Sequence, residues 1–282
     1  MKLYSLKKAH NKTNNIIYNS PHSGENFPEE FLKSVKSSLH TLKTSGDSFV
    51  DQLFEDAQNN GSVLIANQYG RSFIDTNREA YELDPTMFSG EITKPLSDES
   101  QKVKLGYGSI AKYSYTREDI YNDKIPFNEA VNRLEQYYFP IHQTLEQLLN
   151  EQFDKFGYSL LIDCHSMPSY GFIGRKKEAF DQADIILGDR HSKSCNGKLT
   201  DYITQHFQNH DLSVSHNIPF AGGYNTDHYS DVRNNKHAIQ IEIKKSLYMN
   251  EKKRCPNKFF KPFKKIIDEL TYHLDQDIPQ LL

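Results

Sequence analysis

Short apolar runs alternate along this chain with longer amphipathic stretches. Two of the runs, residues 62–66 (SVLIA) and 159–163 (SLLID), have the length and composition of buried strands. Residues 238–244 (AIQIEIK) instead alternate apolar and polar side chains with a period of two, which is typical of a strand with two different faces. This pattern predicts an α/β fold in which helices flank a mixed sheet, formed as a single domain over residues 1–282.

The remaining elements follow from the same periodicities. Further strands are expected at residues 14–19, 72–75 and 183–187. Helices are expected at residues 47–59, 128–153, 196–209 and 257–274. The longest of these should bend at Pro140, because proline cannot donate a helical hydrogen bond. Residues 83–112 are polar and irregular, and a loop of that length is usually functional or partly mobile.

Composition excludes several classes of partner. The chain has 282 residues with 37% hydrophobic and 25% charged side chains, which suits a globular protein with a sizeable core. A net charge of -3 gives no reason to expect binding to nucleic acid or to an anionic membrane. No apolar stretch has the length of a membrane span or of a signal-peptide core. Three cysteines do not form a disulfide framework, so the cytoplasm is the expected location.

A possible metal-binding pair follows the first predicted strand. His22 and Glu25 form an H-x-x-E pattern in the sequence SPHSGE. Catalytic zinc takes three protein ligands, often imidazoles and a carboxylate, and keeps one position for water. Since the chain has twelve histidines, about one such pair is expected by chance, and a surface histidine is the alternative interpretation. The position directly after a strand and Pro21 favours the metal.

His165 is the best candidate for the third ligand. It comes just after the buried run that ends at Asp163, and functional side chains gather at strand ends in α/β sheets. Asp163 could accept a hydrogen bond from an imidazole of the site and orient it as an outer-shell partner.

Glu242 lies in the middle of the alternating strand. Its side chain shares one face with Ala238 and Gln240, opposite the isoleucines. A carboxylate there is unfavourable unless it has a partner, and a metal-bound water would provide one. Glu242 is therefore a candidate general base, with a solvent-facing glutamate on an edge strand as the alternative.

Two arginines flank a short apolar stretch at residues 73–74. Arg71 and Arg78 are candidates for binding a substrate carboxylate or for stabilising a developing oxyanion. Ordinary ion pairs are the alternative.

Taken together, these segments resemble the N-formylglutamate amidohydrolase family over most of the chain and in the family's order. The matching segments are NSPHSGENFP (19–28), GDSFVDQLF (46–54), RSFIDTNRE (71–79), YYFPIHQTL (137–145), LLIDCHSMP (160–168), DIILGD (184–189), NIPFAGGY (217–224) and AIQIEIKKSLYMNE (238–251). Several distinctive segments in order are more specific than any single motif.

The resemblance implies a three-layer α/β sandwich around a mixed eight-stranded sheet, the phosphorylase/hydrolase-like fold of the zinc carboxypeptidases and aspartoacylase. It implies that His22, Glu25 and His165 hold one Zn²⁺ per chain, although Co²⁺, Mn²⁺ or Fe²⁺ could occupy such a site. It also implies roles for three further groups of residues: Glu242 as the base, Arg71 as the residue that polarises the scissile carbonyl, and Asn77 with Arg78 as the carboxylate-binding pair.

The implied reaction is hydrolysis of N-formyl-L-glutamate to formate and L-glutamate, a step of histidine degradation, with a small acidic N-acyl amino acid as the expected partner and the oligomeric state left open. Gly222 and Gly223 are expected either to contact the substrate or to form a turn. His142 and His228 either line the pocket or belong to the scaffold. Two alternatives stay open: a related zinc amidohydrolase for another N-acyl amino acid or small peptide, and a non-catalytic zinc- or ligand-binding protein.

Overall fold

The computed structural model describes residues 2–9, 16–170 and 183–282. The chain divides into two compact units. The first consists of Met1–Ser5, Pro21–Ser48 and Ala66–Leu145, and the second of Leu6–Ser20, Phe49–Ile65 and Glu146–Leu282. No helix in the described residues is long and apolar enough to cross a membrane.

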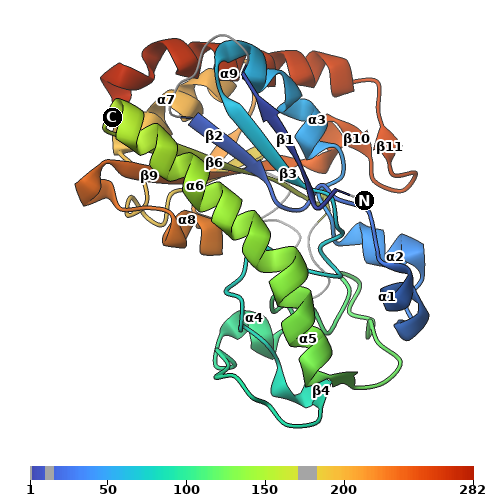
Figure 1. Cartoon of the computed structure of the whole chain (residues 1–282). Coiled ribbons are helices and arrows are strands. Elements are labelled where there is room, and N and C mark those ends of the chain that lie inside the picture. Colours follow the sequence, from blue (N-terminus) through green and yellow to red (C-terminus); the bar gives the residue numbers. More distant parts are fainter. Residues whose placement is uncertain (1, 10–15, 171–182) are drawn as a thin grey trace. The chain divides into compact units, whose positions relative to one another are not determined.

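A seven-stranded sheet is the centre of the fold (Figure 1). Its strands, in spatial order, are β1 (Tyr4–Lys8), β3 (Val63–Asn67), β2 (Ile16–Ser20), β6 (Ser159–Met167), β9 (Lys236–Lys244), β7 (Ile185–Gly188) and β8 (Val214–His216). Strands β2, β6 and β9 are parallel, whereas β7 runs antiparallel to β9. The predicted α/β fold with a mixed central sheet is thereby confirmed, and the described residues contribute seven strands to that sheet where the resemblance implied eight.

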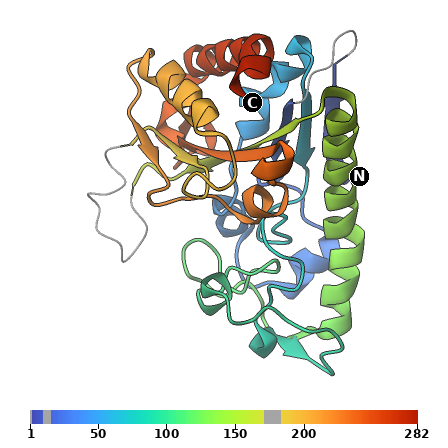
Figure 2. The same ribbon diagram turned by 90° about the vertical axis from the view of Figure 1, so that its left-hand side faces the viewer.

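One face of the sheet forms the main apolar core of the second unit. Ile239, Ile241 and Ile243 of β9 are fully buried there, as the alternation of the sequence predicts. Three helices contribute to this core: α3 (Val50–Leu53), α7 (Gly197–Gln208) and α9 (Phe260–Leu281). In Figure 2 the red helix α9 and the light-orange helix α7 lie together on this side of the strands. Each aliphatic side chain buried in this way contributes roughly 1.5–3 kcal/mol.

The opposite face of β6 and β9 is polar at its centre. Asp163, His165, Gln240 and Glu242 are at most 7% exposed and alternate with the apolar residues of the other face. The short helix α8 (Tyr224–His228) packs against β6 and β9 on this side, and α6 (Phe139–Phe156) runs along the sheet (Figure 1). Buried polar groups need partners, so this polar strip is where the fold can hold a functional site.

The first unit is organised around an aromatic core. Phe31, Phe73 and Tyr121 surround the buried guanidinium of Arg133, whose central carbon lies 4.5 Å from the ring centre of Phe73. The helices and strands of this unit include α1 (Glu29–Ser34), α2 (Leu39–Thr44), η2 (Pro85–Met87), β4 (Phe88–Ser89), α4 (Gln101–Lys104), β5 (Ile125–Pro126) and α5 (Phe127–Arg133). Within the long loop at residues 83–112, Leu83, Met87 and Ile110 are buried in the same core, so the loop is anchored by apolar contacts.

The remaining elements are small and complete the second unit. They are η1 (Glu55–Asn60), η5 (Val232–Asn234), η6 (Lys245–Leu247), β10 (Met249–Asn250) and β11 (Cys255–Pro256).

Several predicted boundaries need correction. The helix expected at residues 47–59 is interrupted after Leu53 and continues as the 3-10 helix η1. The strand expected at residues 72–75 does not form. Residues 71–73 are a turn, and the carboxylate of Asp75 binds the side chains of His22 and Arg71. The first two residues of the strand expected at 14–19 lie outside the described residues.

The long helix predicted at 128–153 forms, but its irregularity precedes Pro140. A π-helical turn, Leu134–Tyr138, joins α5 to α6 and accommodates the amide that Pro140 lacks.

Candidate active site

Parallel strands bring two predicted site segments to the same edge of the sheet. In the register of β2 and β6, Asn19 pairs with Asp163. His165 follows two residues later on β6, and the chain leaves β2 at Ser20, two residues before His22. The carboxyl ends of neighbouring parallel strands are where α/β sheets place their sites.

The imidazole of His165 is oriented by a buried carboxylate. Its Nε2 lies 2.7 Å from Oδ2 of Asp163, which is fully buried. The other oxygen of Asp163 accepts hydrogen bonds from the side-chain amides of Asn19 (2.7 Å) and Asn225 (3.1 Å). Because the carboxylate of Asp163 binds Nε2, a metal would bind His165 through Nδ1. The outer-shell role predicted for Asp163 is consistent with these contacts.

Glu242 lies beside His165 on the neighbouring strand. The two residues pair in the register of β6 and β9, so their side chains leave the same face of the sheet. Glu242 is 7% exposed, and its Oε1 accepts a hydrogen bond of 2.9 Å from Gln240, two residues earlier on the same face. The second unit thus places a buried carboxylate next to a carboxylate-oriented imidazole, which is a suitable pair for proton transfer at a metal site.

In the first unit, His22 has a matching environment. Its Nε2 lies 2.7 Å from Oδ1 of Asp75, and its Nδ1 lies 3.4 Å from Oδ2 of Asp47. The backbone amide of Asp47 also donates to the carbonyl of His22 at 2.9 Å, so the turn after β2 and the segment before α3 are joined. All three side chains are buried.

Asp75 connects His22 to both predicted arginines. Arg71 donates from Nε to Oδ2 of Asp75 at 2.8 Å, and Nη2 of Arg78 lies 3.8 Å from the same oxygen. Burial alone would raise the pKa of Asp75, but the charges of Arg71, Arg78 and His22 outweigh it and hold that pKa well below its usual value. Asp75 is therefore a carboxylate that orients His22 and Arg71 at the same time.

The two arginines differ in what they can reach. Arg78 is 8% exposed, and it donates from Nε to the carbonyl of Tyr107 (2.9 Å) and from Nη1 to that of Asn77 (2.6 Å). Arg71 has 28% of its side chain exposed. Arg71 is consequently better placed to meet a ligand, and Arg78 with Asn77 is rigidly held.

Glu25 differs from the other predicted ligands in its partners. Ser48 donates to its Oε1 at 2.7 Å, Lys43 pairs with its Oε2 at 3.0 Å, and 36% of its side chain is exposed. Among the described residues, the side chains that could together hold a metal ion are His22, Asp47 and His165. The carboxylate in this group is Asp47, a residue that the motif analysis did not select.

Gly222 and Gly223 precede helix α8. Gly222 has a φ of 117°, and a Cβ at this position would lie 2.4 Å from Oγ1 of Thr226. Glycine is required here for conformation and for close packing. The turn interpretation of this segment therefore has a structural reason, and substrate contact by either glycine stays a prediction.

His142 and His228 make contacts that fit the scaffold interpretation. The ring of His142 stacks on Tyr138 with centroids 4.2 Å apart, and His228 stacks on Tyr224 within α8 at 4.8 Å. Cys164, which precedes His165, faces the apolar side of the sheet, where burial raises the pKa of its thiol well above the usual value. It is an inert core residue.

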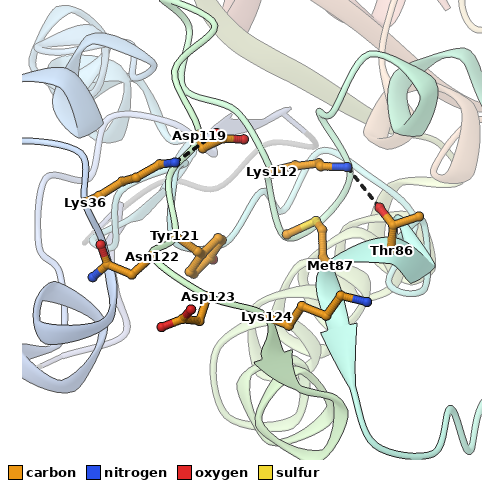
Figure 3. Close-up of a pocket in the computed structure, with 9 residues that line it drawn as sticks. All are labelled: Lys36, Thr86, Met87, Lys112, Asp119, Tyr121, Asn122, Asp123 and Lys124. Carbon is orange, nitrogen blue, oxygen red and sulfur yellow. Dashed lines mark hydrogen bonds and ion pairs between the residues drawn. The ribbon is translucent and has the colours of Figure 1, made fainter.

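A pocket of about 380 Å³ in the first unit is lined by other residues (Figure 3). Met87 and Tyr121 form its apolar floor, and Lys36, Lys112 and Lys124 lie around it. None of the predicted site residues is among those that line this pocket.

Sequence reasoning missed two residues, Asp47 and Asp75. Both lie in segments that carried the family resemblance, GDSFVDQLF and RSFIDTNRE. An aspartate set between two arginines was a usable signal for Asp75. No local signal marks Asp47, because its contact with His22 is made by tertiary folding.

Comparison with known proteins gives consistent matches. The N-formylglutamate amidohydrolase family model matches residues 14–249, which include parts of both units. The chain is 28% identical over 242 residues to an N-formylglutamate deformylase of Pseudomonas putida, covering 84% of this chain and 82% of that protein. It is 26% identical over 243 residues to an N-formylglutamate deformylase of Pseudomonas aeruginosa, with the same coverage.

A solved structure agrees over the full length. The N-formylglutamate amidohydrolase from Ralstonia eutropha JMP134 superimposes with a TM-score of 0.92 at 27% identity, covering 99% of each chain.

Proposed function

Since the chain belongs to the N-formylglutamate amidohydrolase family, we propose that it hydrolyses the amide bond of N-formyl-L-glutamate and releases formate and L-glutamate. The observation that carries the proposal is the pairing of Glu242 with His165 on neighbouring parallel strands, with His165 held by Asp163. The deformylases of the two pseudomonads support the choice of substrate. The single catalytic domain expected from the sequence is part of this proposal.

The donor set fits a divalent metal of zinc type. Two imidazoles, each bound through Nε2 to a carboxylate, and a further carboxylate match the ligands of catalytic zinc. We assign His22, Asp47 and His165 as the ligands, with one Zn²⁺ per chain. Asp47 is preferred over Glu25 because Ser48 and Lys43 already bind both oxygens of Glu25. When bound, the metal would lower the pKa of a water molecule towards neutrality and polarise the formyl oxygen.

The residues of the chain supply the proton transfers and the orientation. Glu242 accepts a proton from the attacking water and passes it to the nitrogen that leaves as the C–N bond breaks. Arg71 stabilises the negative charge that develops on the formyl oxygen. Arg78 and Asn77, held rigidly next to Asp75, bind a substrate carboxylate.

The test is formate release from N-formyl-L-glutamate by the purified protein, with metal removed by chelation and then restored with Zn²⁺. Glu242→Gln removes the base at constant shape, and Glu151→Gln, an exposed glutamate of α6, is the matched control. We expect turnover that requires metal, persists in Glu151→Gln and falls by a factor of at least 100 in Glu242→Gln.

Two outcomes would contradict the proposal. Absence of turnover by folded, zinc-loaded protein excludes the deformylase activity, and a panel of other N-acyl amino acids then identifies the substrate. Full activity of Glu242→Gln excludes Glu242 as the base.

A further inference from the structure

We propose that Arg190 binds the side-chain carboxylate of the substrate and thereby makes the enzyme selective for N-acyl derivatives of acidic amino acids. This inference rests on the proposed function, because it names a specificity residue for that reaction. The residue lies in a turn of the second unit that is not among the predicted site residues.

The turn has an unusual backbone. Arg190, His191 and Ser192 follow β7 and have φ values of 56°, 58° and 62° in succession. The left-handed region is unfavourable for residues other than glycine, and single residues adopt it more often than runs of three. Such conformations persist where the surrounding structure over-determines them, and they concentrate at ligand-binding sites.

Two side chains hold the turn in place. Oδ1 of Asp189 accepts hydrogen bonds from the amide of Ser192 at 2.9 Å and from the side chain of Asn217 at 2.8 Å. In return, Oδ1 of Asn217 accepts from the amides of Asp189 and His191, both at 3.2 Å. The backbone of Arg190 is thus fixed by hydrogen bonds from the residues on either side of it and from a separate segment.

The turn is joined to the polar face that carries Glu242. The amide of Arg190 donates to the carbonyl of Ala221 at 2.8 Å, next to Gly222. The backbone of Gly222 lies directly on Gly188, since a Cβ on Gly188 would be 2.6 Å from its nitrogen. A Cβ on Gly222 would in turn be 3.2 Å from Cδ of Arg190, so the stem of the arginine lies against this loop.

The register then relates Arg190 to Glu242. Gly188 pairs with Gln240, which is two residues from Glu242 on the same face of β9. Two residues of a strand span roughly 7 Å, which is about the reach from the formyl carbon to the side-chain carboxylate in extended N-formyl-glutamate. A substrate whose scissile bond meets Glu242 can therefore extend its side chain towards the loop at Gly222 and the guanidinium of Arg190.

The guanidinium is suited to this task. Its Nη2 pairs with Oδ1 of Asp227 on α8 at 2.7 Å, and 38% of the side chain is exposed. Since arginine has five N–H donors, one contact with Asp227 positions the fork and leaves donors for a carboxylate.

The experiment compares N-formyl-L-glutamate with N-formyl-L-glutamine, which has the same length but no side-chain charge. Arg190→Met keeps the stem that lies against Gly222 and removes the charge. We expect kcat/KM for N-formyl-L-glutamate to fall roughly 10- to 100-fold, mostly through KM, and kcat/KM for N-formyl-L-glutamine to change less than about threefold. Lys193→Met, which removes an exposed charge from the same segment, should alter neither substrate's kinetics.

The outcomes separate this inference from the proposed function. Absence of turnover of both substrates by the unmodified protein contradicts the proposed function. Turnover that Arg190→Met leaves unchanged, or lowers equally for both substrates, overturns the role of Arg190. If Arg190→Met does not fold, Arg190→Lys replaces it, and the loss should again be confined to N-formyl-L-glutamate because lysine cannot form the forked contact.

Discussion

Nε2 of His165 lies 2.7 Å from Oδ2 of Asp163, two residues earlier on the same strand. His22 has the same relationship to Asp75, with 2.7 Å between Nε2 and Oδ1. Each imidazole is therefore oriented by a buried carboxylate from its own unit. Such partners fix the ring and raise its basicity as a metal ligand.

Asp163→Asn should weaken Zn²⁺ binding by roughly 10- to 100-fold, because the amide is a weaker acceptor for the imidazole N–H. Competition with a chromophoric chelator measures the affinity without reference to activity. Asp275→Asn, which changes a buried carboxylate of α9, is the matched control and should leave the affinity unchanged. Equal Zn²⁺ affinities of the unmodified protein and a folded Asp163→Asn would contradict the outer-shell role.

Substitution of each candidate carboxylate in turn shows whether Asp47 or Glu25 is the metal ligand. Asp47→Asn should lower Zn²⁺ affinity by more than the roughly 10- to 100-fold expected for an outer-shell change. Glu25→Gln should retain the metal, since its carboxylate is bound by Ser48 and Lys43. Metal content after gel filtration is the measurement. Loss of metal in Glu25→Gln and its retention in Asp47→Asn would instead identify Glu25 as the ligand, as the H-x-x-E motif predicts.

Gly188→Ala should disturb the loop over the polar face. The new Cβ would lie 2.6 Å from the nitrogen of Gly222 and 2.8 Å from the carbonyl carbon of Ala221, so the backbone must move. We expect a loss of about 2 kcal/mol in the free energy of unfolding, together with reduced activity. At Gly197, the first residue of α7, a Cβ meets nothing within 4 Å, and Gly197→Ala should stabilise by about 0.5 kcal/mol. Urea unfolding measures the free energy of unfolding of both variants. If the loop can shift to accommodate the new Cβ, Gly188→Ala will be no less stable than Gly197→Ala.

Arg133 should be important for the stability of the first unit. Its side chain is 3% exposed, and its guanidinium lies between aromatic rings and donates to the hydroxyl of Tyr121 and the carbonyl of Phe73. Arg133→Met keeps much of the volume but loses these contacts, at about 3 kcal/mol of the free energy of unfolding. Glu129→Gln, which weakens only its partly exposed ion pair, should cost about 1 kcal/mol or less. A loss below 1 kcal/mol for Arg133→Met would show that the ring contacts contribute little.

Stability should depend on pH through His206, which lies between α7 and α9. Burial lowers its pKa, and the neighbouring His210 and His273 lower it further, although its hydrogen bond to the carbonyl of Ile266 opposes this. Among these neighbours of His206, the carboxylate is that of Glu269, which pairs with His210.

A histidine whose pKa is lower in the folded state binds more protons when unfolded. Its contribution is therefore fully present above the unfolded pKa of about 6.5 and is lost as the pH falls towards the folded value. His206→Gln removes the titration and keeps a hydrogen-bond donor, so the decrease of the urea midpoint between pH 7 and pH 5 should become smaller. His40→Gln, at an exposed histidine of α2, is the control. An identical decrease in His206→Gln and the unmodified protein would contradict this role.

The amino-acid sequence by itself determined the alternation of strands and helices and the two faces of β9. Because side chains alternate along a strand, Ile239, Ile241 and Ile243 had to leave one face and Glu242 the other, whatever the sheet order. The buried run before His165 likewise placed that histidine near a strand end. Residues whose function depends on local periodicity or on position after a strand were therefore accessible to prediction.

Tertiary structure alone decided which side chains meet. Asp47 is far from His22 in the sequence, and their contact arises because the segment before α3 bonds to the turn after β2. The left-handed turn at Arg190 is held by Asp189, Asn217 and the carbonyl of Ala221, which come from separate segments. Backbone conformation of this kind is set by long-range hydrogen bonds that outweigh local preference, so no pattern in the sequence could reveal it.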